Sequence, residues 1–184
     1  AVTGGSNSLT LSTGDNVANT DITASGAISG VTTLTLADVG GTATLSADVD
    51  VTTLTVGSTV ANVALNGDGS SVTNAVSFAN DGTLQLGDAT GDTLTFNGGL
   101  TTTSVGSTVT LNGTINASDD AITLGAVTLG SNTAVDTNAA SSNTADLTIA
   151  AVTGGSNTLT LSTENNVANA DITASGAISG VTTL

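Results

Sequence analysis

The opening segment of this chain, residues 1–34, returns almost unchanged as residues 151–184. Four positions differ, and the changes are Ser8 to Thr158, Gly14 to Glu164, Asp15 to Asn165 and Thr20 to Ala170. A repeat this faithful predicts an array in which every unit folds alike and contacts mainly its neighbours. We therefore interpret residues 1–150 as one full repeat unit and residues 151–184 as the start of the next unit in the same array. We expect a sequence of this kind to be an interior stretch of a longer array.

One short pattern recurs within the unit, in which a small polar residue separates two apolar ones. Clear copies are Leu9-Thr10-Leu11, Leu34-Thr35-Leu36 and Leu94-Thr95-Phe96. Strict alternation is the signature of a strand with one buried face, and the branched side chains of Thr and Val suit a pleated surface. Because no segment shows an apolar stripe with the helical period, the sequence predicts an all-β fold.

Turn residues separate these strands at short intervals, for example Asn66-Gly67, Asp81-Gly82 and Asn112-Gly113. Gly and Asn supply the positive φ that tight corners require. VTTLTLADVG at 31–40 and VTTLTVGSTV at 51–60 start twenty residues apart, which indicates the length of one coil. With coils of about 20–30 residues stacked at ~4.8 Å, one unit would hold about five to seven coils.

Two architectures fit this pattern of short strands and turns. Antiparallel sandwich domains joined like beads would use Asn-Gly hairpins, but such domains normally bury large aromatic residues. Phe78 and Phe96 are the only aromatic residues of this chain, and both are expected in the core. A parallel β-helix, or β-solenoid, needs only short strands, Gly, Asn and Asp corners and a narrow interior of small apolar residues. The composition favours the β-solenoid.

The composition also excludes most chemistry, because Lys, Arg, His, Cys, Pro, Met, Trp and Tyr are all absent. Zinc sites, disulfides and Ser-His-Asp arrangements cannot form within the chain. Nucleic acids are not expected partners because no cation is present to meet a phosphate. Asp48 and Asp50 lie close together, but holding a sugar beside them would need basic or aromatic residues, and only the two Phe expected in the core are present. We predict that the chain is not an enzyme and assign no catalytic or cofactor-binding residue.

The charge is entirely negative, since fourteen Asp and one Glu give a formal net charge of −15. Acidic residues spread along a chain mainly confer solubility. Calcium is the one cofactor to consider as an alternative to none, because Asp and Asn turns offer the oxygen ligands that this cation prefers. The candidate calcium ligands are Asp68, Asp81, Asp88 and Asp92. The apolar runs are all too short to span a bilayer, so membrane insertion is not expected.

The threonines that alternate with buried apolar residues are expected to face outward. Ordinary pairing between neighbouring strands explains such residues, and an ice-binding face built from Thr-x-Thr ranks, such as Thr33 and Thr35, is the alternative. The predicted outward set is Thr10, Thr35, Thr55, Thr95, Thr110, Thr123, Thr148 and Thr160.

Two stretches carry a family resemblance, GAISGVTTLTLAD at 26–38 and GDTLTFNGGLTTTSVGSTVTLNGTINASDDAITLGAVTLGSNT at 91–133. They resemble the repeats of giant bacterial surface proteins, namely filamentous-haemagglutinin-like adhesins and autotransporter passengers. The resemblance implies a right-handed parallel β-helix that is secreted, rod-shaped and exposed at the cell surface.

From these features we expect an extracellular structural protein, the shaft of a fibre or of a giant surface protein. Its work would be spacing, tethering or matrix building, and its partners would be identical chains, stacked end to end or bundled side by side. The alternative function is an adhesive or ice-binding β-solenoid module.

Overall fold

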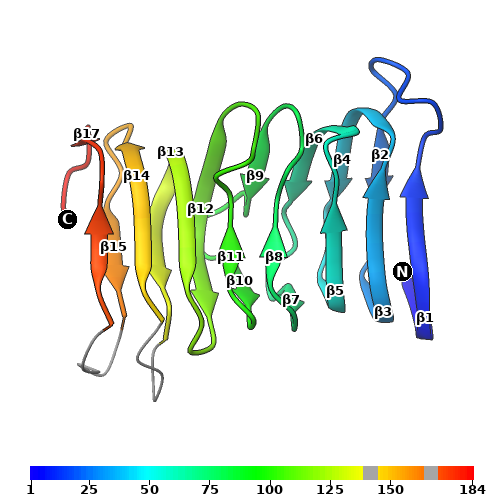
Figure 1. Ribbon diagram of the computed structural model, residues 1–184, viewed down its shortest axis with the longest axis horizontal. Helices are drawn as coiled ribbons and strands as arrows, with labels where there is room; N and C mark the ends of the chain where they lie inside the picture. The colour runs from blue at the N-terminus through cyan, green and yellow to red at the C-terminus, as the bar shows by residue number, and fades with distance from the viewer. Residues whose placement is uncertain (139–144, 164–169) are drawn as a thin grey trace.

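The computed structural model describes residues 1–138, 145–163 and 170–184. Within these ranges the protein is all-β, contains no helix, and forms a β-solenoid of about eight turns. Every strand pairs in parallel with its equivalent in the next turn, and the turns follow one another along the long axis of the molecule (Figure 1). The β-solenoid predicted from the sequence is therefore confirmed.

The strands are short, and several of them bend around a corner of the coil. In chain order they are β1 (Val2–Ser12), β2 (Ile22–Ala24), β3 (Ile28–Ala37), β4 (Val39–Leu45), β5 (Val49–Val56), β6 (Val60–Leu65), β7 (Ser71–Val72), β8 (Val76–Ser77), β9 (Leu84–Leu86), β10 (Thr93–Phe96), β11 (Leu100–Thr101), β12 (Val109–Ala117), β13 (Ile122–Asp136), β14 (Leu147–Thr153), β15 (Leu159–Ser162), β16 (Ile172–Ala174) and β17 (Ile178–Ser179).

Each turn contributes one strand segment to each of three sides, which we call sides A, B and C in chain order. Side A begins at residues 2–3, side B at residues 9–11 and side C at residues 22–24. The same three-way division continues to the end of the chain. Within β13, for example, residues 122–124 belong to side B, 127–129 to side C and 133–136 to side A. The solenoid therefore has a three-sided cross-section.

The spacing between equivalent residues of neighbouring turns varies along the stack. The separation along the chain is shorter between the partners Val109 and Val127 than between the partners Val2 and Ile28. The spacing of twenty that the sequence indicates occurs between Leu34 and Leu54. Strands and corners both vary in length from turn to turn, so turns of unequal length stack on one another.

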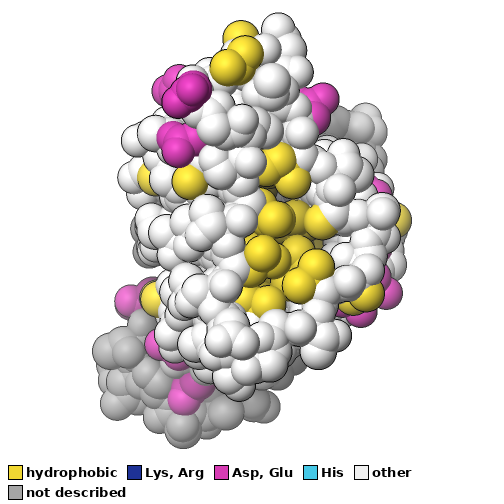
Figure 2. All heavy atoms as spheres, turned by 90° about the vertical axis from the view of Figure 1, so that its right-hand side faces the viewer, with side chains coloured by type: hydrophobic (Ala, Val, Ile, Leu, Met, Phe, Trp, Pro, Cys, Tyr) yellow, Lys and Arg dark blue, Asp and Glu magenta, His cyan; other side chains and the backbone are white. Residues whose placement is uncertain are grey.

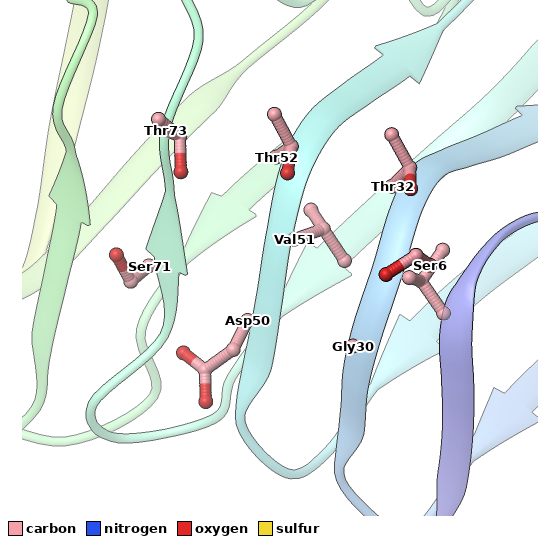
Figure 3. Close-up of a pocket in the computed structure, with 9 residues that line it drawn as sticks. Ser6, Gly30, Thr32, Asp50, Val51, Thr52, Ser71 and Thr73 are labelled. Carbon is pink, nitrogen blue, oxygen red and sulfur yellow. The ribbon is translucent and has the colours of Figure 1, made fainter.

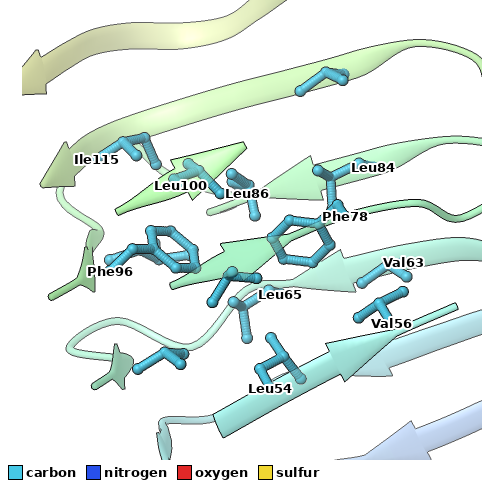
Figure 4. Packing of buried hydrophobic residues seen from close by; sticks show 14 of the residues in the cluster. Leu54, Val56, Val63, Leu65, Phe78, Leu84, Leu86, Phe96, Leu100 and Ile115 are labelled. Atoms are coloured by element: carbon cyan, nitrogen blue, oxygen red, sulfur yellow. The ribbon is translucent and has the colours of Figure 1, made fainter. Parts of the chain in front are cut away.

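The interior is a continuous column of aliphatic side chains, because alternate residues of every segment point inward. Leu34, Leu36 and Leu54 are inward and buried, while Thr35 between the first two faces outward. Phe78 and Phe96 are fully buried in the middle of the stack. Their ring centroids lie 6.2 Å apart at an interplanar angle of 86°, an edge-to-face contact (Figure 4). The two aromatic residues are core residues, as expected.

The two copies of the repeated segment have nearly the same sequence but differ in burial, because they occupy different places in the stack. Val2 is 41% exposed at the first turn, whereas its copy Val152 is 2% exposed because β13 pairs with β14. At the other end Leu34 is fully buried and its copy Leu184 is 69% exposed. Viewed from the end that carries the first turn, hydrophobic side chains are visible in the middle of the molecule, surrounded by backbone and other side chains (Figure 2). Each turn is therefore completed by the turns on either side of it.

Gly113 is a corner glycine with no room for a side chain, and Gly113→Ala is expected to destabilise the fold. Its φ is 68°, and an added Cβ would lie 2.3 Å from the carbonyl oxygen of Asp92. Strain at positive φ alone costs about 1–2 kcal/mol, and the contact with a fixed backbone oxygen adds to it. Urea unfolding followed by circular dichroism would measure the loss.

Gly57→Ala is the matched control for this substitution. A Cβ at Gly57 meets nothing within 4 Å, so its free energy of unfolding should change by less than about 1 kcal/mol. Equal effects of the two substitutions would contradict the corner geometry.

Candidate functional site

The most regular surface of the molecule is a column of hydroxyl groups on side B. Thr10 pairs with Thr35 and Thr35 with Thr55; the bridge between Val56 and Phe78 then brings Ser77 beside Thr55. Each member lies between inward-facing neighbours and so points to solvent, at the ~4.8 Å spacing of paired strands. We call this column the hydroxyl ladder, and its members are Thr10, Thr35, Thr55, Ser77, Thr101, Thr123, Thr148 and Thr173.

The structure divides the predicted outward threonines among all three sides. Five of them belong to the hydroxyl ladder, namely Thr10, Thr35, Thr55, Thr123 and Thr148. Thr95 and Thr160 lie on side A, and Thr110 lies on side C. All eight are exposed or half-buried, but they do not form one face.

The sequence prediction did not include Ser77, Thr101 and Thr173 among the outward residues. Ser77 stands between Val76 and Phe78, which is the same alternation with Ser in place of Thr. Thr101 was harder to recognise because its neighbour Thr102 is buried where the pattern requires an apolar residue. The hydroxyl of Thr102 accepts a hydrogen bond from the Gly125 amide at 3.1 Å, which explains how a polar residue is accommodated there.

A second rank of hydroxyls runs beside the ladder for only three turns. Ser8 pairs with Thr33, and Thr33 with Thr53. In the next turn the amide of Asn74 donates a hydrogen bond to the Thr53 hydroxyl at 2.9 Å, so an Asn side chain follows the Thr. In the described part of the chain, the rank formed by Ser8, Thr33 and Thr53 is therefore limited to this short region.

A shallow groove of about 310 Å³ lies at the corner between sides A and B. Thr32, Thr52 and Thr73 come from three successive turns and stand in a row across it (Figure 3). Asp50 contributes a carboxylate, and the buried Val51 lies beside it. The groove is lined by Ser6, Gly30, Val31, Thr32, Asp50, Val51, Thr52, Ser71 and Thr73. It offers hydroxyl oxygens and one negative charge directly beside the hydroxyl ladder.

Three of the calcium candidates share one corner column, between sides C and A. Asp68 accepts a hydrogen bond from the Thr93 amide at 2.9 Å. Asp92 is buried, and its Oδ2 accepts from the amides of Asp88 at 2.7 Å and Ala89 at 2.8 Å. Asp81 lies at a different corner, between sides B and C. Asp68 and Asp92 thus bind backbone amides and stabilise corners; in the described residues no group of three or more acidic side chains is arranged to hold a metal ion.

Asp88 stands beside the Asp92 carboxylate at this corner. Partial desolvation raises the pKa of the Asp88 carboxyl, and the negative charge of Asp92 and a hydrogen bond to it raise it further. A carboxyl whose pKa is higher in the folded state stabilises the fold at low pH and loses that contribution as the pH rises through the folded pKa. Ionised Asp88 therefore weakens the fold at neutral pH.

Asp88→Asn is expected to raise the melting temperature slightly at pH 7, because it removes this repulsion. The gain should disappear below the ordinary Asp pKa of about 3.9, where the wild-type carboxyl is protonated in both states. Thermal unfolding at several pH values would measure it, with Asp81→Asn as a control for net charge. A gain that persists unchanged at low pH would contradict the assignment.

Comparison of the chain with models of known protein families, with curated proteins and with solved structures found no match. Among the residues described, no helix has the length and apolar character needed to cross a membrane. The fold therefore defines the class of protein here: the chain is a parallel β-solenoid that contains a tandem repeat.

Proposed function

We propose that this chain is part of the shaft of an extracellular fibre or giant surface protein, with a mechanical role in spacing, tethering or matrix building. The observation that supports this function best is the join between the two units. Residues 150 and 151 lie inside one uninterrupted strand, β14, which pairs with β13 from Ile122↔Leu147 to Thr128↔Thr153. A second unit therefore continues the stack that the first unit began, and each added turn lengthens the rod by ~4.8 Å.

The contact between one unit and the next supports self-association as the mode of assembly. Val152, in the second copy of the repeated segment, is buried where β13 of the first unit pairs with β14. A turn of this solenoid thus buries its apolar side chains against another turn of the same kind. The partner we propose is an identical unit, either in the same chain or in a second copy stacked end to end.

The surface chemistry supports a location outside the cell. A chain without Lys or Arg offers no cleavage site to trypsin-like proteases, and its net charge of −15 keeps neighbouring rods soluble. The likeness of residues 26–38 and 91–133 to adhesin and autotransporter repeats supports the same location. We propose a bacterial surface or secreted protein of that general type. Bundling of rods, where it occurs, would use bridging cations and would be reversed by a chelator.

Cryo-electron microscopy of the native material would test the shaft. A continuous rod should give a strong meridional reflection near ~4.8 Å, together with a longer axial repeat that corresponds to one repeat unit. Beaded density without the meridional reflection would overturn the proposal.

The hydroxyl ladder favours a second candidate, a flat binding face for ice or for an adhesive contact. Regular outward hydroxyls on a rigid β surface are suited to such a contact, although the second Thr rank covers only three turns. Thermal hysteresis of the purified chain distinguishes the candidates: a shaft should show none, and a clear hysteresis abolished by Thr35→Leu would place the ice-binding function first.

A further inference from the structure

The two copies of the repeated segment occupy different sides of the solenoid. Ile22 lies on side C, but its copy Ile172 pairs with Leu147 on side B. Leu9 lies on side B, but its copy Leu159 pairs with Thr133 on side A. In each case the copy has moved back by one side.

The register of the strands gives the size of this displacement. Starting at Ile22, six successive pairings stay on side C and lead through Ala43, Val63, Leu84, Val109 and Val127 to Val152. Val152 is the copy of Val2, which lies two sides before Ile22 in the first turn. The step from one unit to the next therefore corresponds to six turns plus two further sides, or about six and two-thirds turns.

The displacement does not arise from a difference at the equivalent corners of the two copies, because their backbone conformations agree there. Ser6 has a φ of 65° and its copy Ser156 has 71°; Gly30 has 64° and its copy Gly180 has 67°. Val2 pairs with Ile28, and their copies Val152 and Ile178 pair with each other in the same way. The segment thus keeps these corner conformations and this pairing on two different pairs of sides.

We infer that an array of these units is a threefold screw, in which each unit is rotated by about a third of a turn relative to the unit before it. Three units would then complete about twenty turns and restore the original orientation. This inference deepens the proposed function and depends on it for every unit beyond the residues seen here. The rotation between the first unit and the start of the second is present in the structure itself.

The screw determines where the surface features of each unit point. The hydroxyl ladder of the first unit runs along side B from Thr10 to Thr148, whereas the copy of Thr10 that opens the next ladder, Thr160, lies on side A. The groove behaves in the same way, because Ser6 lies at the corner between sides A and B and its copy Ser156 lies between sides C and A. A long shaft would therefore present its ladder in three directions in turn, and neighbouring shafts that pack against it would do so from three sides.

Thiol crosslinking tests the rotation in the 184-residue chain, which has no cysteine of its own. The decisive position is Thr148. If the chain between residues 136 and 147 formed one additional side, the repeat would comprise seven whole turns, and successive units would not be rotated relative to one another. In the structure Thr148 is the direct partner of Thr123, and it would lie next to Thr128 if that extra side were present. The two variants to compare are Thr123→Cys with Thr148→Cys, and Thr128→Cys with Thr148→Cys.

Each variant is treated with a short bis-alkylating reagent, and intact mass distinguishes one bridging reagent from two singly attached ones. We expect the Thr123/Thr148 variant to be bridged almost completely and the Thr128/Thr148 variant to carry two separate adducts. Bridging of the second variant, or of neither, would overturn the screw.

Thr35→Cys with Thr55→Cys is the control, because these residues are direct partners within the first unit. If this control also fails to bridge, then the solenoid and the proposed shaft fail together with the screw. If it bridges and Thr148 is misplaced, the shaft survives without the rotation. In native fibres the screw would add layer lines at about three times the axial rise of one unit, near ~96 Å for ~4.8 Å per turn.

Discussion

Phe78→Ala should lower the free energy of unfolding by about 3–5 kcal/mol, the loss typical of a large buried side chain replaced by Ala. Phe78 is fully buried, and its ring meets that of Phe96 edge to face. The substitution removes this contact and leaves a cavity in an interior that is otherwise filled by small aliphatic residues. Urea unfolding followed by far-ultraviolet circular dichroism would give the change.

The stack should respond to this substitution locally, because each turn is stabilised mainly by its neighbours. We expect hydrogen exchange to increase most in β8 and β10 and least in β3 and β14. Phe78→Leu is the control: it keeps most of the volume and should cost less than about 1.5 kcal/mol. An equal loss for both variants would show that the packing described for the two rings is incorrect.

Leu34→Ala and Leu184→Ala are expected to differ sharply, although they alter equivalent residues of the repeat. Leu34 is fully buried between Leu9 and Leu54, so its truncation should cost about 2–5 kcal/mol. Leu184 is 69% exposed at the last turn, so its truncation should change the stability by no more than about 0.5 kcal/mol. The comparison holds the local sequence constant and changes only the presence of a following turn.

The equivalent comparison at the other end of the stack uses Leu9 and Leu159, and here it is the second copy that is buried. Leu159 is buried beneath β13, whereas Leu9 is only partly buried. Leu159→Ala should therefore destabilise more than Leu9→Ala. If the two copies gave equal losses at both ends, then burial by the neighbouring turn would not be what stabilises the stack.

The fold was predictable from the sequence because alternation determines which residues face inward. Leu34-Thr35-Leu36 and Leu54-Thr55-Val56 have the same pattern, and their spacing of twenty residues is the actual turn length at that place. The absence of bulky residues correctly excluded a sandwich in favour of a narrow interior. These predictions depend only on the residue types and their alternation within single strands.

The assignment of residues to sides could not be predicted, because it depends on how much chain each corner absorbs. The corner after side B takes residues 125–126 in one turn and residues 102–108 in an earlier one. No local pattern distinguishes a long corner from a corner plus a short strand. The predicted outward threonines are exposed or half-buried but lie on three sides, and the members of the hydroxyl ladder could be identified only from the register.

The acidic residues illustrate the same limit. Their turn context is visible in the sequence, but the amides that they bind belong to other parts of the chain. Asp68 accepts its hydrogen bond from the distant Thr93 amide, and Asp21 accepts one from the Thr42 amide in the next turn. A carboxylate engaged in this way holds two turns together, which is a role that spacing along the sequence does not reveal.

The mismatch between the length of the repeat and the number of sides has a consequence for how such a protein changes over generations. Tandem repeats gain and lose whole units by recombination. Because each unit spans about six and two-thirds turns, gaining one unit would lengthen the rod and also rotate everything beyond it by a third of a full circle. Gaining three units would lengthen it without rotating it. The number of repeat units would then determine the rotational orientation of any group carried at the end of the rod. Alleles with different numbers of units would orient that group differently about the rod axis.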